Sequence, residues 1–115
     1  MYQFSYAEIL DDSPLLARER ERQAVDRSIE LLIEAEKAGV HSREAVDAVT
    51  LVQRLWAALM EDLAHPSNAL PQALRAQLIS IGVWMMREAE EIRQGRSSNF
   101  KGLIEVSTSI RDGLK

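Results

Sequence analysis

The sequence feature that most constrains the fold is an uncharged apolar stretch from Leu78 to Met86. A helix needs about 20 apolar residues to cross a membrane, so this stretch is too short to be a span. It belongs to a longer helical pattern, whose apolar positions three or four residues apart are Leu74, Leu78, Ile81, Met85, Ala89 and Ile92. Because further apolar residues widen this face, we expect a central helix with neighbours on more than one side.

Helix start and stop signals divide the rest of the chain. Ser13-Pro14 is an N-cap followed by a favourable first helical residue, and Gly39 suits a left-handed C-cap. Ser42 can cap a second helix, which Pro66 ends. The expected helices are 14–38, 43–64, 71–94 and 100–113. With short loops between them, they predict an all-α fold, a four-helix and largely antiparallel bundle in a single domain over residues 1–115.

The N-terminal residues are unusually aromatic, with Tyr2, Phe4 and Tyr6 close together. Large apolar groups seldom stay in water, so we expect this short segment to dock on the bundle. An alternative is a releasable plug that occupies a binding groove until a partner displaces it. Deleting residues 1–10 should then tighten partner binding, whereas loss of stability would mark the segment as core. Weaker binding by an intact fold would mark it as a contact.

Composition excludes several classes of function. The net charge is −4, and the longest charged run, residues 18–22, alternates in sign, so direct binding of nucleic acid is not expected. Without cysteine, no disulfide or thiolate site can form. No catalytic, metal or cofactor motif occurs, and His41 and His65 stand at expected helix ends, where imidazole can bond terminal carbonyls. We therefore expect a protein that is not an enzyme, needs no cofactor and, without a signal peptide or membrane span, resides in the cytoplasm.

One residue departs from the helical pattern of the central stretch. Trp84 falls on the polar side of the helix, among residues that include Ser80, Arg87 and Glu88. A tryptophan in that position is either covered by the N-terminal segment or the last helix, or is exposed as a binding residue. The candidate partner-binding residues are Trp84, Tyr2, Phe4, Tyr6, Ser80, Arg87 and Glu88.

Four sequence blocks, taken in order, resemble a known family. They are Leu55-Trp56 with Asp62-Leu63, the connection 68–71, the run 74–84, and the C-terminal Ile110-Arg111-Asp112-Gly113-Leu114. Together with Tyr6-Ala7 near the start, these blocks are similar to those of FlaF, a family of flagellar biosynthesis regulators. The resemblance covers essentially the whole chain.

The resemblance implies a cytoplasmic protein required for flagellin synthesis and secretion. Two functions follow as alternatives: a chaperone that binds flagellin, at one of its amphipathic terminal helices, or a regulatory adaptor that acts through FlbT, the flagellin translational repressor, without binding flagellin. A homodimer through the broad face of the central helix is a further possibility. The resemblance supplies neither catalytic nor agreed binding residues, so the binding residues named above rest on their pattern alone.

Overall fold

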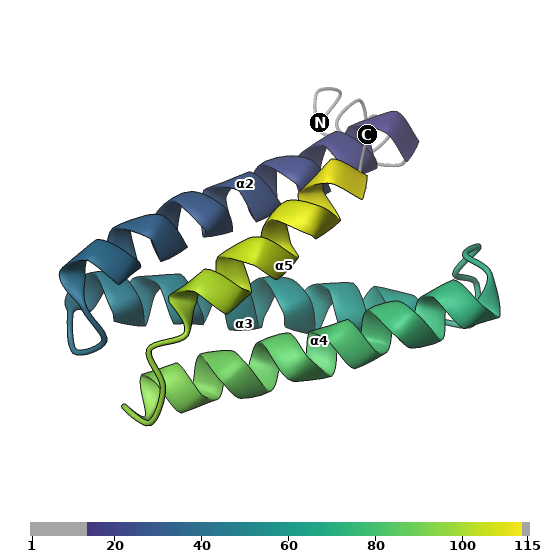
Figure 1. Ribbon diagram of the computed structural model, residues 1–115. Coiled ribbons are helices and arrows are strands. Elements are labelled where there is room, and N and C mark those ends of the chain that lie inside the picture. The colour runs from purple at the N-terminus through teal and green to yellow at the C-terminus, as the bar shows by residue number, and fades with distance from the viewer. Residues whose placement is uncertain (1–13, 114–115) are drawn as a thin grey trace, which may run out of the picture.

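The computed structural model describes residues 14–113, which form four helices. They are α2 (Pro14–Ala38), α3 (Arg43–Ala64), α4 (Gln72–Arg93) and α5 (Phe100–Gly113), and they confirm the all-α prediction (Figure 1). Each helix begins and ends within one residue of the expected position. The aromatic N-terminal segment and the expected N-cap Ser13 lie outside the described residues.

The helix ends follow the capping chemistry of the sequence. The Ser42 Oγ accepts a hydrogen bond from the Ala45 amide at 3.0 Å, and the Asn99 Oδ1 accepts one from the Gly102 amide at 3.0 Å. Gly39 and Gly95 follow α2 and α4 with φ values of +100° and +77°, the left-handed conformation that favours glycine. Local signals therefore account for both the starts and the stops of these helices.

Successive helices run in opposite directions, so the starts of α2 and α4 lie at the same end of the bundle (Figure 1). α2 packs against α3 and α5, and α3 packs against α2 and α4, whereas α4 and α5 barely touch. From their connecting loop, α5 leans away from α4 and onto α2 (Figure 1). The prediction that α4 is the central helix was therefore wrong. The central pair is α2 and α3.

Burial changes along the helical pattern that identified α4. We call its residues Leu74, Leu78, Ile81, Met85, Ala89 and Ile92 the α4 seam. Met85 and Ala89 are completely buried, Leu78 and Ile81 are half-buried, and Leu74 is 40% exposed. The covering helix α5 has 14 residues against the 22 of α4 and diverges from it, so it covers only the C-terminal part of the seam.

The core forms where all four helices meet. Its buried residues are Leu32 and Ala35 of α2, Ala45, Ala48, Val49, Val52 and Trp56 of α3, Met85, Ala89 and Ile92 of α4, and Phe100 and Leu103 of α5. Trp56 of α3 is buried. Val46 of the same helix is 53% exposed. The position lies on the edge of the apolar face of α3, and no described helix covers it.

α4 crosses α3 closely at Gly82. A Cβ atom added to Gly82 would lie 2.8 Å from the Met60 sulfur and 2.9 Å from Cε3 of Trp56. The buried glycine therefore allows the α4 backbone to rest directly on two large α3 side chains, which fixes the position of α4.

Candidate functional site

The candidate binding residues of α4 form one surface patch. Trp84 is 38% exposed, so no described helix buries it, and burial by the last helix, one of the alternatives given above, is not found. Ser80 lies four residues before it, and Arg87 and Glu88 lie three and four residues after it, so all are its neighbours on the helix surface. We call these four residues the Trp84 patch. Ser80 and Arg87 are exposed and Glu88 is half-buried.

The other candidates, Tyr2, Phe4 and Tyr6, lie outside the described residues, so the structure does not relate them to the Trp84 patch. What the structure adds is an apolar surface beside the patch. Ile81 of the α4 seam precedes Trp84 by three residues, which makes the two side chains neighbours on α4. The Trp84 patch is thus continuous with the part of the seam that α5 leaves uncovered.

At the start of α4 the exposed apolar surface extends into the preceding loop. Leu70 and Leu74 are each 40% exposed. The loop is held by hydrogen bonds: the Asn68 Oδ1 accepts from the Leu70 amide at 3.0 Å, and the Asn68 Nδ2 donates to the Asp62 carbonyl at 3.0 Å. His65 takes part through its Nδ1, 3.1 Å from the Ser67 amide, so the ring bonds the loop and not a terminal carbonyl as expected.

The N-terminal part of α4 carries a single charged side chain, Arg75. Its Nη1 donates to the Leu63 carbonyl, 3.5 Å away at the end of α3, while its buried Nε has no hydrogen-bond partner within residues 14–113. Pro71, at the N-cap of α4, supplies no side-chain hydrogen bond, and the first turn contains no acidic residue. This end of α4 therefore combines a guanidinium with the positive end of a helix dipole.

At the opposite end of α4, Glu90 connects three polar side chains. Its Oε2 accepts from Gln94 at 2.8 Å, and its Oε1 accepts from Arg93 at 3.0 Å and from Gln53 of α3 at 3.1 Å. These hydrogen bonds, the Gln94 bond foremost, lower the pKa of Glu90 to about 2.

The next residue, Glu91, is paired with Arg96 at 2.7 Å, and this hydrogen bond lowers the pKa of the Glu91 carboxyl. Both carboxylates are therefore satisfied by groups of the protein itself. They fix the C-terminal end of α4 and its loop.

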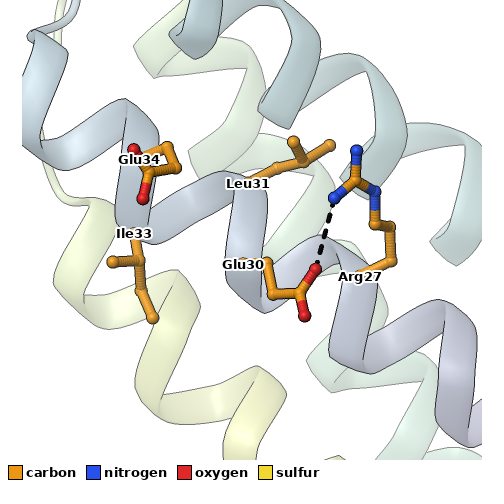
Figure 2. Close-up of a pocket in the computed structure, with 5 residues that line it drawn as sticks. All are labelled: Arg27, Glu30, Leu31, Ile33 and Glu34. Carbon is orange, nitrogen blue, oxygen red and sulfur yellow. Dashed lines mark hydrogen bonds and ion pairs between the residues drawn. The ribbon is translucent and has the colours of Figure 1, made fainter.

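A second surface feature lies on α2. Arg27, Glu30, Leu31, Ile33 and Glu34 line an open depression of about 380 Å³ (Figure 2). All five residues belong to this one helix, and the Arg27 and Glu30 side chains pair across 3.2 Å (Figure 2). Ligand sites usually enclose a molecule with polar groups that converge from several elements, and this depression has no such arrangement.

Within residues 14–113, no group of three His, Cys, Asp or Glu side chains is placed to hold a metal ion. In the same part of the chain, no helix has both the length and the apolar character that a membrane crossing requires. Among the large hydrophobic side chains exposed within residues 14–113, Leu70, Leu74, Val83 and Trp84 lie on α4 or in the loop before it.

The helical periodicity of the sequence singled out Trp84 but did not predict the uncovered end of the seam. A periodic pattern gives the same weight to every residue on an apolar face and carries no information on how far a neighbouring helix extends along it. The sequence held one signal for this outcome, since the last helix is 14 residues long and α4 is 22. At 1.5 Å per residue, α5 could not cover α4 along its whole length.

The fold defines a small all-helical protein with one long apolar helix face left partly uncovered. A family model described as flagellar protein FlaF matches residues 2–114, nearly the whole chain. The chain therefore belongs to the FlaF family, which confirms the resemblance and gives it a role in the flagellum. Neither a curated protein nor a solved structure matches it.

Proposed function

We propose that this protein is a cytoplasmic chaperone and regulator that binds flagellin and thereby supports its synthesis and secretion. The observation that carries the proposal is the surface on α4 where the exposed Trp84 lies beside the half-buried Ile81 and the uncovered end of the seam. Membership of a flagellar family supports flagellin as the partner. The preferred ligand is an amphipathic terminal helix of flagellin, whose apolar side needs a cover before assembly.

Recognition would follow the helix-in-groove mode, in which apolar residues spaced three or four apart pack on a complementary face. Trp84 is suited to be the anchor because tryptophan is enriched among residues that dominate binding energies. Two side chains of opposite charge border Trp84: Arg87, which is exposed, and Glu88, which is half-buried. Such charged side chains at the rim of an interface select the orientation of a partner more than they add affinity.

The direct test is calorimetric titration of the full chain with purified flagellin and, separately, with FlbT, in physiological salt. Saturable binding of flagellin at a Kd of about 1 μM or tighter, a binding free energy of about −8 kcal/mol, is the expected result. Binding of FlbT with no binding of flagellin would contradict the proposal and favour the adaptor function.

Replacing Trp84 tests whether flagellin binds at this surface of α4. Trp84→Ala should weaken flagellin binding by about 2 kcal/mol or more, roughly thirtyfold in Kd. The melting temperature should stay nearly unchanged, because Trp84 is not part of the buried core. Ile33→Ala is a matched control, since Ile33 is an apolar residue of α2 with the same 38% exposure. If both variants lost affinity equally, or if Trp84→Ala alone caused a large fall in melting temperature, Trp84 would not be a binding residue of the interface.

A further inference from the structure

The α4 seam is built as a core face along its whole length but lacks a cover at one end. Leu74, Leu78 and Ile81 continue the register of fully buried Met85 and Ala89, yet exposure rises toward Leu74. An apolar helix face of this kind normally packs against another element. Within the described residues α3 packs against α4, but no second helix covers this end of the seam, because α5 diverges onto α2 (Figure 1).

We propose that the chain's own N-terminal segment, residues 1–10, docks on this uncovered end of the α4 seam. The segment precedes Pro14, and the start of α2 lies at the same end of the bundle as the start of α4 (Figure 1). The thirteen residues before Pro14 can extend over about 43 Å, which exceeds the 36 Å and 22 Å extents of the molecule across its longest axis. The chain before α2 is therefore long enough to cross the molecule toward the seam.

The composition of the segment fits the face in apolar character and in charge. Tyr2, Phe4, Tyr6, Ile9 and Leu10 can cover leucine and isoleucine side chains. The charged side chains that precede Pro14 are all acidic: Glu8, Asp11 and Asp12. The half-buried Arg75 lies beside the face, three residues before Leu78, and the α4 N-terminus has no side-chain cap. Acidic groups are favourable at both.

The absence of cysteine makes docking measurable by thiol labelling without background. A single Gln77→Cys, next to Leu74 and Ile81 on α4, leaves the seam intact. Its labelling rate is compared in two full-length chains, one with the natural N-terminus and one with Tyr2→Ser, Phe4→Ser and Tyr6→Ser. The natural chain should label at least about tenfold more slowly, which corresponds to a cover more stable closed than open by about 1.4 kcal/mol.

Glu61→Cys, exposed on α3 near the same end of the bundle, is the control and should label equally in both chains. A second measurement does not depend on the triple variant. Ser5→Cys should form an intramolecular disulfide with Gln77→Cys faster than with Glu61→Cys. Equal labelling of Gln77→Cys in the two chains, or equal disulfide rates at the two positions, would overturn the proposal.

Docking at this position also predicts competition, a consequence that rests on the proposed function. The segment would occupy the surface next to Trp84, so the triple serine variant should bind flagellin more tightly than the natural chain. Labelling is measured without flagellin, and a failure of flagellin binding therefore leaves the docking result standing. Slow labelling of the natural chain with no gain in affinity for the variant would reject the competition.

Discussion

At Gly82, α4 has no room for a side chain against α3. An added Cβ would come within 2.9 Å of both Met60 and Trp56. The methionine can move, but the buried Trp56 ring is confined by the core. Gly82→Ala gains about 1 kcal/mol of helix propensity and loses about 1–3 kcal/mol to overpacking. We expect a net decrease of about 1 kcal/mol in the free energy of unfolding, measured by urea denaturation.

Gly113 provides the matched control for this prediction. It also belongs to a helix, but nothing lies within 4 Å of an added Cβ. Gly113→Ala should leave the free energy of unfolding unchanged or raise it slightly, because only the propensity effect remains. If Gly82→Ala stabilised the protein as much as Gly113→Ala does, the close crossing of α3 and α4 at Gly82 would be wrong.

Glu90 makes stability depend on pH in the acid range. Its pKa is about 2 in the folded protein, and an unfolded glutamate titrates near about 4.3. Below about pH 4.3 the unfolded chain takes up the proton more readily, so the stabilisation from Glu90 is complete above that pH and is lost as the pH falls toward about 2.

Glu90→Gln should therefore lower the melting temperature at pH 7 and flatten its decline between about pH 4.3 and about pH 2. Glu61→Gln, an exposed position of α3, controls for the change in net charge. Parallel declines in the natural protein and in Glu90→Gln would show that the hydrogen bonds from Gln53, Arg93 and Gln94 do not perturb this carboxyl.

At the scale of helices, side-chain caps mark where α3 and α5 begin. Ser42 and Asn99 both accept a hydrogen bond from an amide three residues later. Replacing either with alanine should lower the free energy of unfolding by about 1 kcal/mol. Ser98→Ala, exposed in the loop before α5, should change it much less. If Ser98→Ala and Asn99→Ala lowered the free energy of unfolding equally, Asn99 would not be the N-cap of α5.

Capping and periodicity act within a few residues, and for that reason the limits of the helices could be predicted. The neighbours of α4 could not. The same apolar periodicity describes a helix packed on two sides and one that rests mainly on α3, and the lean of α5 arises from packing against α2. Leu74 was consequently expected inside and is exposed. For the candidate site, Trp84 was predictable because a single aromatic residue on a polar strip is visible in the pattern.

For the whole molecule, the arrangement of helices leaves one side of the bundle incomplete. α2 and α3 each contact two helices, whereas α4 relies on α3. A partner that fills this side binds the folded chain and not the unfolded one, so it must raise the stability of the entire bundle. Flagellin at 100 times its Kd should add about 2.7 kcal/mol to the free energy of unfolding.

Hydrogen exchange followed by mass spectrometry can measure this stabilisation, because peptides of the two proteins are resolved. Core amides around Val49 and Val52 should exchange more slowly when flagellin is present, and Trp84→Ala should reduce the effect. Protection confined to α2, with the core unaffected, would contradict binding at α4.

The graded burial of the α4 seam also determines which partner loses freedom on binding. Met85, Ala89 and Ile92 hold one end of the helix in the core, and the Gly82 crossing fixes its middle, so Trp84 lies on a backbone that is held on both sides. The ordering entropy of association then falls mainly on the incoming peptide. Affinity should accordingly follow the peptide's own tendency to form a helix, and ligands that already prefer that conformation would be selected over more flexible ones.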